Sequence, residues 1–277
     1  MITFLGRLMS VVLAGGVTAT LVAGPPIHYL TPSKYVASLG EKVFVHFDRG
    51  SAVAAQPVAW PAAQVEWLLI RGGGDQENRH QVPADGPDGA QVSVRIEHPG
   101  VTLIGADLSP TVFELPRQEL REFVRQYAAG APADLRLPED RQCVRVRQIA
   151  SAKTFVRVTD GSTVFGSSPI ATGKSGQVVE IRPLFDPTNV QVGSDLPLRL
   201  YIDGDKAVGV RVQATHVSSG RTASFLSDAQ GTGWFRVVAT GVWRVEFHQV
   251  RAPTETNDEW TVYSGTLTFE VQKGAGQ

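Results

Sequence analysis

The stretch "LPLRLYIDGDKAVGVRVQATHV", from Leu196 to Val217, decides the fold. Every second residue of its first part is apolar, which gives a strand one apolar face; these residues are Leu196, Leu198, Leu200 and Ile202. Asp203-Gly204 is a turn signal, after which the alternation resumes at Val208, Val210, Val212 and Ala214. The stretch therefore predicts a β-hairpin in which each strand buries one face.

Similar short patterns flank this stretch on both sides. They are "KVFVHF" (42–47), "QVEWLLI" (64–70), "QVSVRIE" (91–97), "VTLIGADL" (101–108), "GWFRVV" (233–238), "GVWRVEFHQV" (241–250) and "TVYSGTLTFEV" (261–271). Because each such strand can bury only one face, two sheets must cover each other. The sequence predicts an all-β, antiparallel sandwich architecture, and the 28 glycines and 17 prolines suit its many turns.

One helix is expected within "ELPRQELREFVRQYAAG" (114–130). Its apolar residues recur at helical spacing, namely Leu120, Phe123, Val124 and Tyr127. Prolines in the following "APADLRLPEDR" (131–141) indicate a linker. The expected organisation is an N-terminal β domain that ends in the helix (24–130), a linker (131–152), a C-terminal β-sandwich (153–271) and a tail (272–277).

Residues 1–23 form an apolar leader with one early cation, Arg7, as in a signal peptide. The apolar run from Leu8 to Ala23 is shorter than the roughly 20 residues that span a membrane. We expect export with cleavage of the leader, so that the protein is periplasmic or extracellular. An uncleaved N-terminal anchor is the alternative, and it would be the protein's only contact with a membrane.

Composition argues against several classes of protein. The net charge of −1 has no basic excess of the kind that suggests nucleic-acid binding. The single cysteine, Cys143, cannot form an internal disulfide or a Cys-based zinc site. It lies in the alternating "RQCVRVRQI", which predicts a packed strand thiol.

Motifs that would indicate an enzyme are missing from the sequence. Gly173-Lys174-Ser175 matches the end of a phosphate-binding loop, but the chain continues as the strand-like "QVVEIRPLF" instead of a helix, so a turn is expected. Neither a G-x-S-x-G elbow nor an H-E-x-x-H or C-x-x-C motif is present. We therefore expect a protein that is not an enzyme.

The six histidines are too far apart in the sequence to form a local metal site; they are His28, His46, His80, His98, His216 and His248. His248 shares strand parity with Arg244 and Glu246, which predicts an exposed or edge position for it. His216 shares parity with Val212 and is expected to be partly buried near a strand end.

Several segments together resemble a known family. They are "IHYLTPSKYVASLGEKVFV", "FELPRQELREFV", "ASAKTFVRV", "GQVVEIRPLFDPTNVQVGSDLPLRLYIDGDKAVGVRV" and "GVWRVEFHQV". In this order they resemble an exported domain-of-unknown-function family, often labelled nickel uptake or periplasmic component of cobalt/nickel transport. The resemblance covers roughly residues 27–271 and includes the groups Ser151-Ala152-Lys153 and Glu180-Ile181.

The resemblance implies two β-sandwich-like domains with one linking helix, the C-terminal domain being similar to the transthyretin-like or carboxypeptidase-regulatory type. It also implies the handling of a divalent nickel or cobalt ion, with a metal permease or another envelope protein as partner. The histidines that match the family are His28 and His248. An acidic helper for them would come from Glu255, Asp258 or Glu259.

Two functions are therefore expected as alternatives. A protein that binds or delivers nickel or cobalt needs two or more imidazoles that converge on one point. A structural or interaction module of the cell envelope, which binds protein or glycan, should instead present an exposed apolar patch or an aromatic-rimmed groove.

Overall fold

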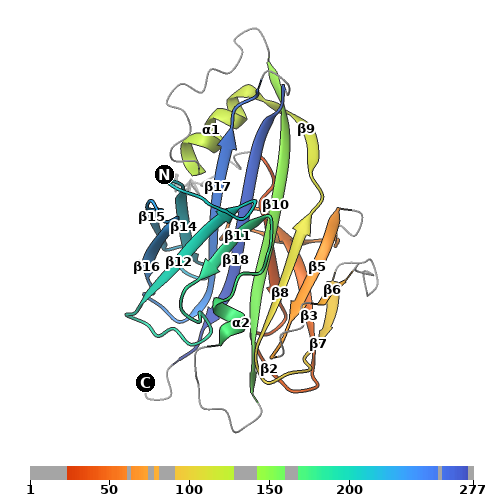
Figure 1. The fold of residues 1–277 in the computed structure, drawn as a ribbon, viewed down its shortest axis with the longest axis vertical. Coiled ribbons are helices and arrows are strands. Elements are labelled where there is room, and N and C mark those ends of the chain that lie inside the picture. Colours follow the sequence, from red (N-terminus) through yellow and green to blue (C-terminus); the bar gives the residue numbers. More distant parts are fainter. Residues whose placement is uncertain are drawn as a thin grey trace, which may run out of the picture.

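The computed structural model describes residues 24–60, 64–73, 78–80, 91–127, 142–159, 168–254 and 258–273. These residues form three β-sheets and two helices (Figure 1). The leader (1–23) lies outside the described residues. Neither helix in the described part of the chain has the length and hydrophobicity needed to cross a membrane.

A ten-stranded sheet runs along the long axis of the molecule (Figure 1). Its strands are β2 (Val36–Ser38), β5 (Val65–Arg71), β6 (Asn78–His80), β8 (Gly100–Leu108), β9 (Thr111–Pro116), β10 (Cys143–Thr159), β14 (Arg211–His216), β15 (Thr222–Leu226), β17 (Gly241–Arg251) and β18 (Trp260–Val271). Their order is β15-β14-β17-β18-β10-β8-β5-β6, and β2 and β9 also pair with β10. The sheet thus contains strands from both halves of the chain.

Strand β10 joins these two halves. It pairs in parallel with β18 over Val146–Thr154 and antiparallel with β9 over Cys143–Gln148 and with β8 over Phe155–Val158. The linker expected at residues 131–152 is therefore wrong for Cys143–Ala152, which belong to this strand. The prolines that suggested the linker all precede the strand. Cys143 begins it with an exposed thiol, not the packed thiol that its alternating context predicted.

Two four-stranded sheets cover the ten-stranded sheet. The first contains β1 (His28–Pro32), β3 (Lys42–Arg49), β4 (Gln56–Val58) and β7 (Gln91–Arg95). The second contains β11 (Val179–Pro183), β12 (Asp195–Ile202), β13 (Asp205–Lys206) and β16 (Thr232–Arg236). Each small sheet forms a sandwich with a different part of the large one.

Each sandwich has its own apolar core, and β10 contributes to both. The first core contains Phe47 from the first small sheet and Val156 from β10. The second contains Leu200 from the second small sheet, Phe155 from β10 and Trp243 from β17. Adjacent residues of β10 thus point into different cores, as strand geometry requires. The all-β, sandwich-like prediction is confirmed.

The hairpin predicted within Leu196–Val217 is only partly correct. The turn is present, with positive φ at Asp203 (54°) and Gly204 (82°), but the paired return ends after Lys206. The chain then crosses to the ten-stranded sheet, where β14 pairs with β15 and β17. The apolar faces of β12 and β14 therefore meet across the second core instead of lying side by side in one sheet.

Helix α1 (Arg117–Tyr127) confirms the predicted helix. Its buried residues are the four that showed helical spacing, Leu120, Phe123, Val124 and Tyr127. They form a third core with Val146 of β10 and Trp260 of β18. The short helix α2 (Pro169–Thr172) packs against β8 and β11 near the second small sheet.

A buried ion pair links β10 to the second small sheet. Lys153 of β10 is 1% exposed, and its Nζ lies 3.2 Å from Oε1 of Glu180 on β11, which is 2% exposed. Burial lowers the pKa of Lys153, against the raising effect of Glu180. Burial also acts to raise the pKa of Glu180, but Lys153 and the bonds from Ser175 outweigh it and hold this pKa below its usual value.

Hydrogen bonds hold the loop between α2 and β11 in place around this ion pair. The backbone N–H of Ser175 donates to Glu180 Oε1 at 2.7 Å, and the Gln177 side chain donates to the carbonyls of Ala106 and Ala152. Gly173-Lys174-Ser175 therefore belongs to a loop that leads into β11, so a strand and not a helix follows it, as expected.

We expect Lys153→Met to lower the free energy of unfolding by about 3–5 kcal/mol, because it leaves the Glu180 carboxylate buried without its counter-charge. Lys153→Met combined with Glu180→Gln should recover much of this loss, since the amide oxygen still accepts the Ser175 N–H. Denaturant unfolding measures both variants, and Arg236→Ala, which breaks an exposed pair with Asp195, serves as a control with little effect. A double variant no more stable than Lys153→Met would contradict this account.

Candidate functional site

His28 lies at the first position of β1 and faces the first core. Its ring packs against Phe47 with 5.1 Å between the ring centroids. Its Nδ1 is buried without a hydrogen-bond partner among the described residues. Burial, aided by the nearby positive charge of Arg49, lowers the pKa of His28 to about 4. The imidazole is therefore neutral at neutral pH.

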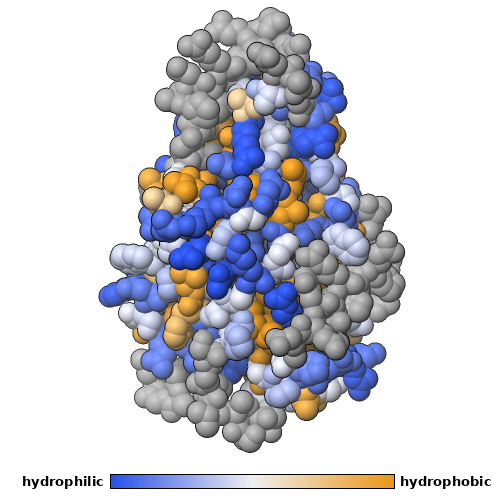
Figure 2. Space-filling view, in the orientation of Figure 1, coloured by the Kyte–Doolittle hydropathy of each residue, from blue (hydrophilic) through white to orange (hydrophobic). Residues whose placement is uncertain are grey.

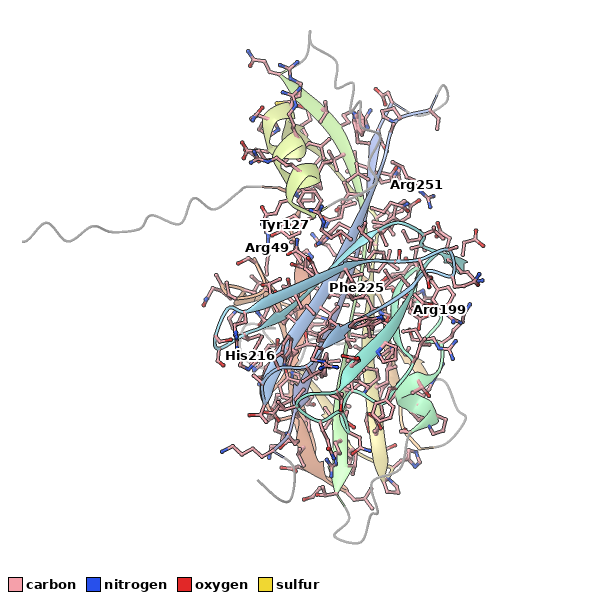
Figure 3. All side chains as sticks on the ribbon, turned by 90° about the vertical axis from the view of Figure 1, so that its left-hand side faces the viewer. Arg49, Tyr127, Arg199, His216, Phe225 and Arg251 are labelled. Atoms are coloured by element: carbon pink, nitrogen blue, oxygen red, sulfur yellow. The ribbon has the colours of Figure 1, made fainter. Side chains whose placement is uncertain are left out.

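A pocket of about 210 Å³ opens beside His28. It lies where the first small sheet meets β8, β9 and β10 of the large sheet. Its lining consists of Pro26, His28, Arg49, Gln64, Leu108, Ser109, Thr111, Phe113, Gln148 and Ala150. Arg49 ends β3 on the side nearer to α1 (Figure 3). The pocket thus combines an apolar wall with several polar groups.

His248 lies within β17 and is 0% exposed. The rings of Phe123 and Tyr127 from α1 lie edge-on against it, each with centroids 5.1 Å away. The predicted exposed or edge position is wrong, because β17 is an interior strand and α1 covers the face that strand parity suggested was open. Parity shows which residues share a face but does not show what covers it.

His248 belongs to a buried polar cluster. Its Nε2 lies 3.7 Å from Oε2 of Glu246, which also accepts a hydrogen bond from the Tyr29 hydroxyl. Its Nδ1 lies 3.0 Å from the Ser264 hydroxyl oxygen. Burial, followed by the charge of Glu246, raises the pKa of Tyr127 to about 12 and that of Tyr29 well above its usual value. Both phenols thus stay protonated.

The structure does not bring His28 and His248 together. Successive side chains of a strand point to opposite faces, and Tyr29 is the β1 residue that contacts Glu246. The ring of His28 therefore points away from the side of β1 that meets His248. Within the described part of the chain, no three His, Cys, Asp or Glu residues are grouped so that they could hold a metal ion.

The proposed acidic helpers are engaged elsewhere or lie outside the described residues. Glu259 binds Arg145 at 2.9 Å and Arg147 at 2.8 Å. Asp258 lies 3.7 Å from Arg145. Glu255 is outside the described residues.

His216 is buried near the end of β14, as its parity predicted (Figure 3). Its Nδ1 lies 2.7 Å from the Ser219 hydroxyl oxygen, and its Nε2 lies 2.8 Å from the Thr240 carbonyl oxygen. Both ring nitrogens thus have protein partners, which marks a structural histidine.

The outer face of the second small sheet carries a surface that the sequence did not single out. Trp234 of β16 is 61% exposed and stands opposite Pro197 of β12 in the strand register. The neighbouring pairs on this face are Asp195 with Arg236 and Arg199 with Thr232. The sequence does contain one indication of this surface. Trp234 alternates with the buried Phe235 along the strand, so its ring points to the opposite, exposed face.

Basic side chains gather on the same face. Lys174 lies over the ring of Tyr201 on β12, 4.0 Å from its centroid. Burial acts to raise the pKa of Tyr201, but hydrogen bonds from Arg182 and Arg199 and the charge of Lys174 lower it below the usual value. Arg199 on β12 is labelled in Figure 3, toward the right-hand edge of the molecule.

Comparison with known proteins identifies a family. A family model described as a domain of unknown function (DUF4198) matches residues 28–251. A search of curated proteins found no match. Among solved structures, a two-domain fibronectin type III segment of chicken tenascin is 13% identical and covers 87% of this chain and 98% of its own, with a TM-score of 0.22.

Two other solved structures are similarly remote. The fibronectin(III)-like modules of CbhA from Clostridium thermocellum are 10% identical and cover 90% of this chain and 99% of their own, with a TM-score of 0.19. A Salmonella alpha-2-macroglobulin mutant is 10% identical and covers 94% of this chain and 16% of its own, with a TM-score of 0.23.

We expect His28 to make the free energy of unfolding depend on pH between about 4 and 6.5. In this window the unfolded imidazole binds a proton that the folded one does not, so stability falls as the pH falls, by an upper limit of about 3 kcal/mol. Denaturant unfolding across this window measures the effect for wild type and His28→Gln, with His98→Gln as the control for loss of an exposed histidine. If His28→Gln keeps the wild-type pH slope, the buried neutral state of His28 is wrong.

Proposed function

The chain belongs to the family of the domain of unknown function DUF4198, and we propose that it is an exported, non-enzymatic interaction module of the cell envelope that binds an acidic polysaccharide. The observation that carries this proposal is Trp234, whose large ring is 61% exposed on the outer face of the second small sheet. Trp is enriched where proteins meet ligands and partners, because its large ring has apolar faces and a polar N–H at its edge.

The surface around Trp234 extends over three strands. Arg199 and Arg236 stand on either side of the Trp234–Pro197 pair, and Lys174 and Arg182 lie beyond Arg199 around Tyr201. We name these residues, with Trp234, Pro197 and Tyr201, the Trp234 face. Over this part of the molecule hydrophobic and hydrophilic surface alternate (Figure 2).

An acidic polysaccharide suits the Trp234 face in both shape and charge. The flat indole ring can stack on the apolar face of a sugar ring. Guanidinium groups bind carboxylates through two parallel hydrogen bonds, so Arg199, whose Nε donates to the Thr232 hydroxyl, favours uronic acids over neutral sugars, whereas Arg236 is already paired with Asp195.

The buried cluster at His248 supports the absence of enzymatic activity. Ser264, His248 and Glu246 are the residue types of a hydrolytic triad, but the hydroxyl and the imidazole are both buried. A substrate cannot reach a hydroxyl in this position, and a nucleophile must be accessible to its substrate. The cluster therefore favours a structural role.

A divalent nickel or cobalt ion as cargo, delivered to a metal permease, is the second candidate function. The specific observation in its favour is that Nε2 of His248 has no hydrogen-bond partner among the described residues and lies 3.7 Å from Glu246 Oε2. Ser264 beside Nδ1 and Tyr29 beside Glu246 resemble the outer hydrogen bonds that orient metal ligands. Imidazole nitrogen and carboxylate oxygen are donor types that nickel and cobalt accept, and the other positions of such an ion would need water.

We expect Trp234→Ala and Arg199→Gln each to weaken binding to immobilised polygalacturonate by roughly tenfold, because a stacked ring and a charge-assisted bond are lost. Affinity electrophoresis or surface plasmon resonance measures this, with a neutral glucan as the control ligand and Trp67→Ala, whose ring is 39% exposed on β5, as the control variant. Added salt should weaken the wild-type interaction.

The glycan proposal fails if wild type does not bind polygalacturonate, or if Trp67→Ala weakens binding as much as Trp234→Ala. Equal retention on the neutral glucan would also contradict it. Binding to a purified envelope protein that depends on Trp234, without binding to polygalacturonate, would replace the glycan by a protein partner.

For the metal candidate, we expect calorimetric titration with Ni²⁺ to give heat that His248→Ala abolishes and His28→Ala leaves unchanged. The reason is that only His248 has a carboxylate beside its free nitrogen. Glu246→Gln should reduce the heat as well. Equal heats in wild type and His248→Ala, or no heat in wild type, would remove the metal candidate.

A further inference from the structure

The pocket beside His28 is separate from the Trp234 face and has its own chemistry. It lies between the first small sheet and the ten-stranded sheet, whereas the Trp234 face belongs to the second small sheet. Polysaccharide binding at the Trp234 face does not involve this pocket. The lining residues determine which ligand the pocket can bind.

The charge of the lining favours an anion. Arg49 is the one charged side chain among the described residues that line the pocket, and none of these residues is a carboxylate. Arg49 also has no ion-pair partner in the part of the chain that the structure describes. The planar guanidinium is suited to hold a carboxylate with two hydrogen bonds.

One residue of the lining, His28, carries a polar atom without a hydrogen-bond partner among the described residues. Nδ1 of His28 is buried and has no hydrogen-bond partner among the described residues, which is costly unless something binds it. The ring is neutral, so this nitrogen can accept a hydrogen bond from a ligand hydroxyl. An ammonium group in this place would be repelled by Arg49.

The remaining lining fixes the size and the polarity of the ligand. The volume of about 210 Å³ is below the roughly 300–1,000 Å³ of pockets that take drug-sized molecules. Leu108 and Phe113 supply an apolar wall, and Ser109 and Thr111 supply hydroxyl groups. The Gln148 side chain is held in place by a 2.6 Å bond to the Pro26 carbonyl oxygen.

We infer that this pocket binds a small hydroxycarboxylate, with the carboxylate on Arg49, the hydroxyl group on His28 Nδ1 and a short carbon chain against Leu108 and Phe113. The pocket would then serve the protein as a sensor or carrier site for an organic acid. It is a binding site only, and no bond of the ligand is broken.

The test uses nuclear magnetic resonance titration of the exported chain with three matched compounds. Lactate carries both groups, propionate lacks the hydroxyl and lactamide lacks the charge. Saturable shifts at residues around the pocket are expected with lactate, with roughly tenfold weaker binding of propionate and weaker binding still of lactamide.

Variants locate the site. Arg49→Gln and His28→Phe should each weaken lactate binding by roughly tenfold, whereas Arg125→Gln, which removes an exposed arginine on α1, should not. The backbone spectrum of each variant shows whether it is folded. The inference is overturned if lactate gives no saturable shifts, if Arg49→Gln binds lactate as wild type does, or if lactamide binds as well as lactate. These outcomes are independent of polygalacturonate binding at Trp234.

Discussion

Lys153 carries a charge in the middle of the strand that both sandwiches share, and Glu180 compensates that charge from the second small sheet, 3.2 Å away. A buried charge without a partner is strongly unfavourable, so packing of the two sheets that brings these residues together is favoured over packing that separates them. The loop from Gly173 to Val178 is fixed by the same pair, because Ser175 donates to Glu180. The two residues thus specify how the second sandwich is assembled onto β10.

The positions of the candidate sites follow from this arrangement. Because β10 is covered on both faces, surfaces for ligands remain at the places where sheets end or face outward. The pocket at His28 lies at such a seam between sheets, and the Trp234 face is the outward side of the second small sheet. His248, in contrast, lies in an interior strand, where the Phe123 and Tyr127 rings of α1 cover it.

The sequence was sufficient for local structure and insufficient for pairing. Period-two alternation predicted that Leu198 and Leu200 are buried, and helical spacing predicted the buried face of α1. Alternation could not show that β12 and β14 lie in different sheets. A strand buries one face whether its neighbour in sequence pairs with it in the same sheet or packs against it from the facing sheet. It also could not show that α1 covers His248, because the contact depends on residues more than a hundred positions apart. The resemblance did mark Lys153 and Glu180, although their charges gave no hint that they form a buried pair.

The direction of β10 and β18 has a mechanical consequence. The two strands run in parallel along the long axis of the molecule and stay in register from Val146–Trp260 to Thr154–Thr268 (Figure 1). Hydrogen bonds between strands lie across the strand direction. A force that pulls these two strands apart along that axis therefore loads the whole row of bonds in shear instead of opening them one after another.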